Sequence, residues 1–406
     1  MALRLSLALL IAAALTACGD STDPGSGPDV VPATLAVGSA HACRIAPSGK
    51  LACWGRGSEG QLGSGDLPQV AGPRWVDGGG VIFRSVVAGR SHTCALDEEG
   101  AAYCWGAGDL GQLGVNLSAL LPCGAILCSP LPAPAGGAHR FVALAAGDQF
   151  TCGLEAAGTV WCWGLGDVGQ LGQTISEECG GTRCSFAPVQ VQGELRLRTL
   201  SAGRSHVCGL TSGGDAVCWG YNYQGQLGRG DEVDSPEPRT VSTSERFVQL
   251  SAGGLHTCAV TAARAAHCWG IDALGAGSTI LESTVPVPVA GGATYSQVEA
   301  GRVTTCAIRS DGLVECWGTN LSSEMGFPEA EIHETFPEPV RTGSDLRLET
   351  IAGEYLTYCG IAPDDGTWCW GAGEQGQLGS GNVDSADPLN VPLMEEGAPA
   401  ARAPRR

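Results

Sequence analysis

The side chains best suited to chemistry in this chain of 406 residues are its 19 cysteines, and their spacing indicates which chemistry they do. Seven pairs share a separation of ten residues: Cys43 with Cys53, Cys94 with Cys104, Cys152 with Cys162, Cys208 with Cys218, Cys258 with Cys268, Cys306 with Cys316, and Cys359 with Cys369. Structural zinc sites use cysteines about two to four residues apart, and this chain has no Cys-x-x-Cys. The spacing therefore favours disulfides over zinc.

Four more cysteines form two close pairs, Cys123 with Cys128 and Cys179 with Cys184, each with four residues between its members. We expect each pair to close a small stapled loop. Cys18 is the one cysteine left over. Without it 18 cysteines remain, and an even number is typical of an exported chain held by disulfides.

The N-terminus has the pattern of an export signal. Residues 1–4 carry one positive charge, and residues 5–15 are an apolar run broken by a single serine. This run is too short to span a membrane and has the length of the apolar part of a signal peptide. It ends in Leu-Thr-Ala-Cys at Cys18, which resembles the bacterial lipobox, where the cysteine is lipidated.

These residues predict a lipoprotein signal peptide at 1–17 and a lipidated N-terminus with a flexible tether at 18–33. The chain would then be exported and held in the bacterial cell envelope by its lipid anchor, at the outer membrane or the cell surface. Cleavage near Ala17 as an ordinary signal peptide, or an uncleaved anchor, is the alternative.

The ten-residue cysteine pairs mark seven repeats, with periods of 48 to 58 residues. Each second cysteine is followed by Trp-Gly, at Trp54, Trp105, Trp163, Trp219, Trp269, Trp317 and Trp370. Five repeats continue with Gly-Gln-Leu-Gly, beginning at Gly60, Gly111, Gly169, Gly225 and Gly376. A glycine precedes every first cysteine: Gly38, Gly89, Gly147, Gly203, Gly253, Gly301 and Gly353.

Each cysteine pair brackets a predicted β-hairpin. In the second repeat, two short β-prone runs flank the polar, glycine-ended turn 97–100, which is a hairpin signal. Cys94 and Cys104 lie symmetrically about this turn. Directly opposed residues on antiparallel strands have Cβ atoms about 4.5–5.5 Å apart, close enough for a disulfide after a slight approach of the strands.

The whole unit, with its glycine turn, cysteine hairpin, Trp-Gly and Gly-Gln-Leu-Gly, resembles the repeat of the regulator of chromosome condensation family. The resemblance implies an all-β fold, a seven-bladed β-propeller with four-stranded blades, over residues 34–395, followed by a disordered tail at 396–406. The cysteine pairs depart from the intracellular members of the family. A disulfide within the hairpin of each blade is therefore expected in addition to the family fold.

The repeated histidines could form a metal-binding ring, but one repeat argues against it. His41, His92, His206 and His256 share a repeat position that holds Phe150 in the third repeat and Thr304 in the sixth. Because phenylalanine can pack but cannot ligate, we expect a structural histidine that hydrogen-bonds its own blade. We predict no metal, no cofactor and no catalytic residue among the repeated positions.

The charged residues of the chain argue against a nucleic-acid partner and against lysine-dependent chemistry. Acidic residues outnumber basic ones to give a formal net charge of −19, which argues against nucleic acid. Lys50 is the single lysine, so lysine-dependent phosphate or Schiff-base chemistry has almost no candidate. The nucleotide exchange on a nuclear GTPase for which the family is best known is not expected of an exported chain.

The sequence thus predicts a non-enzymatic, monomeric scaffold that binds an envelope or extracellular protein through loops on one propeller face. The segments 115–130 and 173–188, each holding a close cysteine pair, are expected to form a raised rim there. Its candidate contact residues are apolar: Leu117, Leu120, Leu121, Ile126, Leu127, Ile175 and Phe186. The alternatives are a structural envelope lipoprotein without a ligand, or a carbohydrate-active enzyme with a carboxylate pair meeting across blades.

Overall fold

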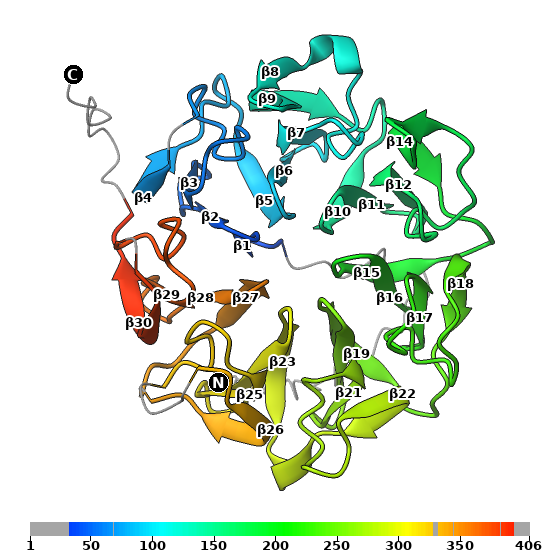
Figure 1. Ribbon diagram of the computed structural model, residues 1–406, viewed down its shortest axis with the longest axis vertical. Helices are drawn as coiled ribbons and strands as arrows, with labels where there is room; N and C mark the ends of the chain where they lie inside the picture. The colour runs from blue at the N-terminus through cyan, green and yellow to red at the C-terminus, as the bar shows by residue number, and fades with distance from the viewer. Residues whose placement is uncertain (1–31, 68, 328–331, 344, 382, 394–406) are drawn as a thin grey trace, which may run out of the picture.

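Seven β-sheets form a ring around a central channel (Figure 1). The computed structural model describes residues 32–67, 69–327, 332–343, 345–381 and 383–393. The predicted signal peptide, Cys18, most of the tether and the tail at 396–406 lie outside these ranges. Within the described ranges, no helix is long and apolar enough to cross a membrane.

Each blade is built from strands that are consecutive in the chain. Blade 1 consists of β1 (Leu35–Val37), β2 (His41–Ile45), β3 (Leu51–Gly55) and β4 (Val70–Trp75). Blade 2 consists of β5 (Phe83–Ala88), β6 (His92–Asp97), β7 (Ala102–Ala107), β9 (Ile126–Ala135) and the short β8 (Leu121–Cys123) outside β9. Blade 3 consists of β10 (Phe141–Ala146), β11 (Phe150–Glu155), β12 (Val160–Leu165), β14 (Thr182–Gln190) and the short β13 (Glu178–Cys179) outside β14.

The other four blades have four strands each. Blade 4 consists of β15 (Leu197–Ala202), β16 (His206–Thr211), β17 (Ala216–Gly220) and β18 (Ser235–Thr240). Blade 5 consists of β19 (Phe247–Ala252), β20 (His256–Thr261), β21 (Ala266–Ile271) and β22 (Glu282–Pro288). Blade 6 consists of β23 (Tyr295–Ala300), β24 (Thr304–Arg309), β25 (Val314–Thr319) and β26 (Thr335–Arg341). Blade 7 consists of β27 (Thr350–Glu354), β28 (Thr357–Ile361), β29 (Thr367–Gly371) and β30 (Ser385–Val391). Two 3₁₀ turns lie in connections elsewhere: η1 (Leu117–Ala119) between β7 and β8, and η2 (Ala290–Gly292) between β22 and β23.

The predicted seven-bladed propeller with a disulfide in each hairpin is confirmed. All strand pairs within the blades are antiparallel, and the two cysteines of each hairpin are directly opposed in register. Their Cα atoms are 4.0 to 4.1 Å apart. The seven hairpin disulfides join Cys43 to Cys53, Cys94 to Cys104, Cys152 to Cys162, Cys208 to Cys218, Cys258 to Cys268, Cys306 to Cys316, and Cys359 to Cys369. The structure also bonds Cys123 to Cys128 and Cys179 to Cys184, each with Cα atoms 5.8 Å apart.

The hydrophobic core lies between blades rather than within one. Seven clusters of buried side chains each combine residues from two neighbouring blades, including one cluster that joins blade 7 to blade 1. A single sheet has two apolar faces and cannot bury either alone, so each blade depends on its two neighbours.

The seven tryptophans anchor these interfaces. Each is buried, and its indole N–H donates to a main-chain carbonyl of the preceding blade, at 2.8 to 3.1 Å. In five blades the acceptor is the glutamine of Gly-Gln-Leu-Gly. The last glycine of that motif is needed because a Cβ on Gly63 would lie 2.8 Å from the indole nitrogen of Trp105. The motif therefore forms a socket for the tryptophan of the next blade.

The first and last blades are each built from strands of a single repeat, and Arg44 of blade 1 connects them. In other blades a large apolar residue at the start of the first strand covers a small residue after the first hairpin cysteine, as Phe141 covers Gly153. Blade 1 lacks that residue, and Arg44 occupies the place of the small one, only 2% exposed. Its guanidinium bonds the main-chain oxygen of Asp365 at 2.7 Å, the carboxylate of Asp365, and the hydroxyl of Thr367. Blade 1 is thus tied to the hairpin of blade 7 by a buried arginine.

Candidate functional site

Chain direction divides the connections between the two faces of the propeller. The first strand of each blade is innermost and the pairing is antiparallel. The connections between first and second strands, and those between third and fourth strands, therefore emerge together on what we call the loop face. The hairpin turns and the links between blades emerge on the opposite face, the hairpin face.

The two stapled loops lie on the loop face of adjacent blades, as the chain direction predicts (Figure 1). In blade 2 the staple between Cys123 and Cys128 joins β8 to β9, and in blade 3 the staple between Cys179 and Cys184 joins β13 to β14. Among the predicted contact residues, Leu117 is 43% exposed and Leu121 is 56% exposed. The residues Ile126, Leu127 and Phe186 are half-buried.

Two of the predicted contact residues belong to the core instead. Leu120 is 8% exposed and Ile175 is 7% exposed, so neither is available to a partner. Gly108 lacks the Cβ that would meet the Leu120 side chain at 2.7 Å. Each loop therefore folds one apolar side chain inward, over the buried leucine of Gly-Gln-Leu-Gly. The sequence pattern could not separate this inward residue from its exposed neighbours.

Exposed apolar side chains gather on the loop face. Of the twelve large apolar side chains that are exposed among the described residues, nine lie in connections between third and fourth strands. These nine are Leu67, Leu117, Leu121, Tyr223, Val233, Ile280, Leu281, Ile332 and Val383. They come from six of the seven blades and make the outer part of this face a candidate contact surface.

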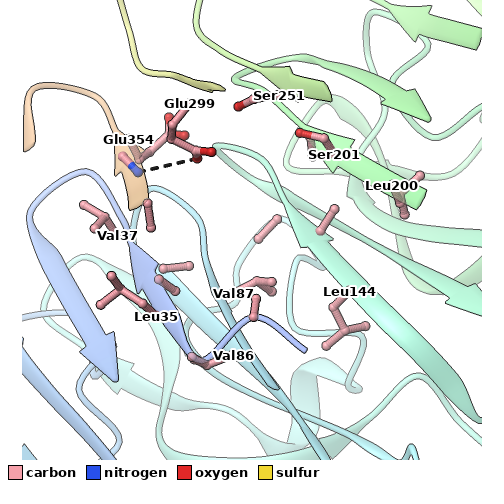
Figure 2. A pocket seen from close by; sticks show the side chains of 18 of the residues that line it. Leu35, Val37, Val86, Val87, Leu144, Leu200, Ser201, Ser251, Glu299 and Glu354 are labelled. Carbon is pink, nitrogen blue, oxygen red and sulfur yellow. Dashed lines mark hydrogen bonds between the residues drawn. The ribbon is translucent and has the colours of Figure 1, made fainter. Parts of the chain in front are cut away.

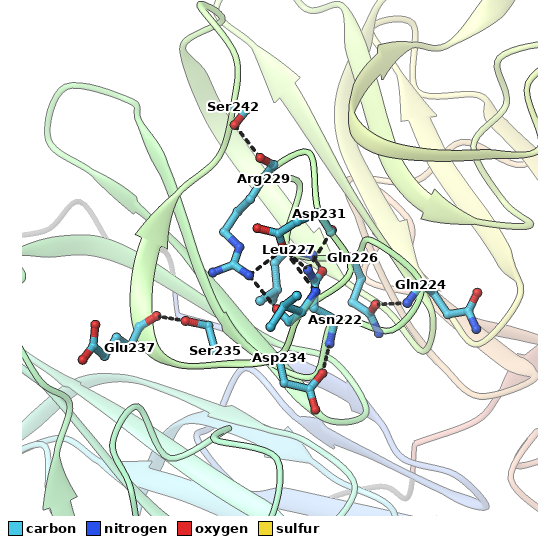
Figure 3. A network of polar contacts seen from close by, with 11 residues as sticks. Asn222, Gln224, Gln226, Leu227, Arg229, Asp231, Asp234, Ser235, Glu237 and Ser242 are labelled. Atoms are coloured by element: carbon cyan, nitrogen blue, oxygen red, sulfur yellow. Dashed lines mark hydrogen bonds and ion pairs between the residues drawn. The ribbon is translucent and has the colours of Figure 1, made fainter.

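The corresponding loop of blade 4 is shorter and has no disulfide, and a polar network holds it (Figure 3). Asn222 is fully buried; its side-chain amide N–H donates to the main-chain and carboxylate oxygens of Asp231, both at 2.9 Å. Its side-chain oxygen accepts the N–H of Leu227 at 2.8 Å, and its own N–H donates to Asp234 at 2.7 Å. Arg229 pairs with Asp231 at 2.7 Å.

At the centre of the loop face, one variable residue follows each repeated glycine turn. These residues form what we call the mouth ring: Ser39, Arg90, Asp148, Arg204, Gly254, Arg302 and Glu354. Main-chain bonds between neighbouring blades hold the ring from blade 2 to blade 7, among them Arg90 N–H to the Asp148 oxygen and Asp148 N–H to the Arg204 oxygen, both at 3.2 Å. The residue at this position differs from repeat to repeat, although it directly follows a glycine present in all seven repeats.

Below the mouth ring the channel contains a cavity of about 250 Å³ (Figure 2). All seven innermost strands line it, mostly with alanine, valine and leucine. Glu299 and Glu354 come together on one side, where the N–H of Gly353 donates to a carboxylate oxygen of Glu299 at 3.4 Å. Ser201 and Ser251 are the other polar side chains labelled in this view.

Burial sets the protonation of these two acids. It raises the pKa of Glu299 to about 8. Burial, together with the nearby carboxylates of Asp148 and Glu299, raises the pKa of Glu354 well above its usual value. Both side chains keep some exposed area because they face the cavity, but protein surrounds them. Burial therefore favours the protonated, uncharged form of both acids.

The repeated histidines bond the next blade, not their own as the sequence analysis expected. The four side chains are fully buried, and their ring nitrogens bond threonine hydroxyls of the following blade at 2.7 to 2.9 Å: His41, His92, His206 and His256. Burial lowers the pKa of His41 to about 3 and that of His92 to about 4. Within the described ranges no three His, Cys, Asp or Glu side chains are grouped to hold a metal ion.

The other three blades depart from this pattern. Phe150 replaces the histidine in blade 3, and the following blade carries Val207 where the partners of the four histidines carry threonine. In blade 7 the repeat position is held by Thr357, which pairs with Gly371 in the same register as the histidines. The residue inserted before it places Tyr355 in the left-handed region, at φ 56°. The hydroxyl of Thr357 donates to the main-chain oxygen of Ala372 in its own blade at 3.0 Å, so it is the histidines and Phe150 that join neighbouring blades.

Comparison with known proteins identifies the architecture. The model of the RCC1-like domain matches residues 73–402, and the model of the Regulator of chromosome condensation (RCC1) repeat matches residues 48–96. The chain is 34% identical over 217 residues to the ultraviolet-B receptor UVR8 of Arabidopsis thaliana, covering 52% of this chain and 46% of the receptor. It is 29% identical over 225 residues to human Protein RCC2, covering 50% of this chain and 42% of that protein.

Solved structures show the same fold. The crystal structure of Prp20p from Saccharomyces cerevisiae superimposes with a TM-score of 0.73 at 23% identity, covering 91% of this chain and 88% of that one. Binding properties to Gsp1p and histones are described for Prp20p. The matched segment is less than half the length of the two curated relatives above.

Proposed function

Because the chain belongs to the RCC1 family of repeat propellers, we propose that it is a cell-envelope-anchored, non-enzymatic scaffold that binds a protein partner through its loop face. The observation that carries this proposal is the location of nine of the twelve exposed large apolar side chains on that face. The stapled loops add a second argument, since a loop that is already closed loses less conformational entropy on binding.

The experiment is capture of a partner by the loop face. The full chain would be expressed with export and cross-linked in envelope preparations, and the captured protein would be identified and purified for direct binding measurements. In a graft variant, residues 107–128 and 165–184 are each replaced by the blade-4 connection 221–234, which joins strands in the same register. We expect the graft to remain folded and to lose the partner.

A finer pair of variants removes only side chains. Leu117→Ser with Leu121→Ser changes two exposed residues of the loop face, and Ile82→Ser with Val248→Ser changes two exposed residues outside it. Binding should weaken at least about tenfold in the first pair and stay unchanged in the second. Equal binding by wild type and graft would overturn the proposal and make the hairpin face the next candidate. Failure of the wild type to capture any partner would favour a structural lipoprotein.

Envelope anchoring is tested separately at Cys18. Replacement by serine should abolish incorporation of labelled fatty acid and release the protein from the membrane fraction. Retention of the Cys18→Ser protein in that fraction, without lipid, would instead indicate an uncleaved anchor.

A second candidate has one observation in its favour. Glu299 and Glu354 form a carboxyl pair across blades 6 and 7, as a carbohydrate-active enzyme would require. The side chains that line the cavity are mostly alanine, valine and leucine, and these offer no hydrogen bonds to sugar hydroxyls. Hydrolysis of a glycan panel that disappears in Glu299→Gln would favour this enzyme over the scaffold.

A further inference from the structure

We propose that the mouth ring binds a carboxylate group at the tip of the partner's docking loop or at the partner's C-terminus, with Arg90, Arg204 and Arg302 as anchoring cations. This inference rests on the proposed function, because it names the chemistry that the partner presents to the loop face. It concerns the centre of the face, whereas the graft variant tests the outer loops.

The first argument is that the three arginines are held on a rigid frame. Each follows a glycine whose close packing leaves no room for a side chain; a Cβ on Gly89 would lie 2.3 Å from the main-chain oxygen of Gly147 in the next blade. The main-chain bonds between blades fix the arginine Cα positions around the channel. The frame therefore fixes the points from which the three side chains extend, which lowers the entropy cost of binding.

The second argument is the local balance of charge. Arg204 pairs with Asp148 at 3.2 Å, and Arg90 and Arg302 lie close enough for their charges to act on the same carboxyl. Asp148 is thus one carboxylate among three guanidinium groups. Glu354 is the other acid of the ring, so the ring holds three arginines against two acids even when both carboxylates are charged. The mouth ring therefore keeps a positive excess in a chain whose formal net charge is −19.

The arginines are also accessible. Arg90 is exposed, and the Arg204 side chain is 50% exposed. The guanidinium of Arg302 lies 4.6 Å from the centre of the Tyr355 ring and donates to its hydroxyl at 2.9 Å, which fixes its orientation. A pocket of about 340 Å³ opens beside Arg90 and Arg204, and its wall gains hydrogen-bonding groups from Gln149, Ser205 and Tyr221. An acidic side chain entering there meets charge and hydrogen-bond donors together.

The arginines lie at the centre of the loop face, and acidic residues lie on its outer loops. Exposed acidic residues surround the mouth ring on the outer loops: Asp66, Asp167, Glu177, Glu178, Asp231, Glu232, Asp234 and Glu374. An anionic bilayer, being flat, would meet these outer acids first and be repelled. A narrow protein element with a carboxylate at its tip can reach the cations at the centre while meeting few of the outer acids; of these, Asp167 lines the pocket beside Arg90 and Arg204. The pattern therefore favours a protein partner over a lipid surface.

The test uses fluorescein-labelled peptides as probes of the full-length protein. One amidated peptide carries two adjacent central glutamates, a second carries glutamines in their place, and a third is the glutamine peptide with a free C-terminal carboxylate. Anisotropy titrations at low salt should show saturable binding of the first or third peptide and not of the second. Binding of the first identifies a side-chain carboxylate as the preferred group, and binding of the third identifies a chain terminus.

Matched variants assign the binding to the mouth ring. The triple variant Arg90→Gln, Arg204→Gln, Arg302→Gln should bind at least about tenfold more weakly. The control triple variant Arg140→Gln, Arg196→Gln, Arg246→Gln removes the same charge from exposed arginines of the hairpin face and should bind as wild type does. Asp148→Asn should bind the carboxylate peptide more tightly, which a misfolded variant would not do.

Several outcomes would overturn the inference. These are no binding of either carboxylate peptide, equal losses in the two triple variants, weaker binding by Asp148→Asn, or a stronger response to phosphatidylglycerol vesicles than to peptide. If the graft variant loses the partner while the mouth-ring triple variant keeps it, the carboxylate inference fails and the proposed function stands.

Discussion

Blades 2 and 3 close their loop-face connections with disulfides, whereas blade 4 closes its connection with a buried asparagine. The paired glycine and serine at the ends of these connections, Gly106 with Ser129, Gly164 with Ser185 and Gly220 with Ser235, are 23, 21 and 15 residues apart. In the short connection one side chain reaches both ends of the loop. The longer ones extend beyond that reach, and there a covalent bond supplies the closure.

Substitutions in the disulfide-closed loops of blades 2 and 3 and in the asparagine-closed loop of blade 4 should therefore have different effects on stability. Asn222 is fully buried and accepts the N–H of Leu227, which is part of the core. The staples close the outer ends of loops whose inner ends are already packed by Leu120 and Ile175. Damage in blade 4 should lower the stability of the fold, and damage in blades 2 and 3 should mainly free a loop.

The largest effect is expected for Asn222→Ala. The change leaves the Leu227 N–H and the Asp231 main-chain oxygen without their partner. We expect a loss of about 2–4 kcal/mol in the free energy of unfolding. Urea denaturation measures it, with Gln224→Ala as the control, because that side chain points away from the network (Figure 3). Equal losses in the two variants would contradict the role given to Asn222.

A smaller effect is expected for Cys123→Ser with Cys128→Ser. Closing so short a loop stabilises a folded chain by at most roughly 2 kcal/mol in the chain-entropy estimate. Because the loop can open alone, we expect rapid protease cleavage within 115–127 and a smaller drop in melting temperature than Asn222→Ala causes. Limited proteolysis with mass spectrometry measures the cleavage. A protected loop in the serine variant would show that packing alone closes it.

A substitution in blade 6 should stabilise the fold. Glu324 occupies the position at which five other blades have the glutamine of Gly-Gln-Leu-Gly. It is fully buried, and burial raises its pKa. A raised pKa in the folded state means that stability is lost as the pH rises and the acid must ionise. Glu324→Gln should therefore stabilise the protein by about 1 kcal/mol at pH 8. The gain should shrink below the usual pKa of 4.5, which pH-dependent denaturation measures.

The smallest effect is expected at low pH and only in the loop 221–234 of blade 4. Burial alone would raise the pKa of Asp231, but its bonds to Val233, Arg229 and Asn222 outweigh burial and lower it. A lowered pKa gives stability above the usual value of 3.8 that is lost as the pH falls further. The amide protection factors of residues 221–234, which correct for the pH dependence of intrinsic exchange, should fall below that pH. Those of 121–128 should stay unchanged because disulfides do not titrate. A parallel fall in both loops would contradict the distinction between them.

The sequence alone predicted the fold because each repeat repeats its whole geometry. Ten-residue cysteine spacing is the signature of a hairpin with opposed cysteines, and Trp-Gly with Gly-Gln-Leu-Gly marks the two halves of the interface between blades. Contacts between repeats were less accessible. The histidine was assigned to its own blade because sequence shows position within a repeat, whereas its threonine partner lies about 50 residues away in the next blade.

The candidate site was predicted only in its outer part. The stapled loops were visible as extra length and extra cysteines, but burial of Leu120 and Ile175 depends on space left by Gly108 and Gly166. The mouth ring escaped notice because its residues vary from blade to blade, and its members share a position but not a chemistry. Only the closed ring brings them together, so their joint charge is a property of the ring and not of any repeat.

The bonds between each histidine and the threonine of the following blade also restrict how the repeats can be duplicated during evolution. Where the threonine is missing, the neighbour has changed with it, as Phe150 faces Val207 and Thr304 lends its main-chain oxygen to the hydroxyl of Tyr358 at 2.6 Å. A histidine repeat copied in front of blade 4 would meet the wrong neighbour; His92 beside Val207 would have no hydroxyl to bond. The order of the repeats is therefore constrained at such positions, and a newly duplicated blade would be accepted only next to a blade that already carries the complementary residue.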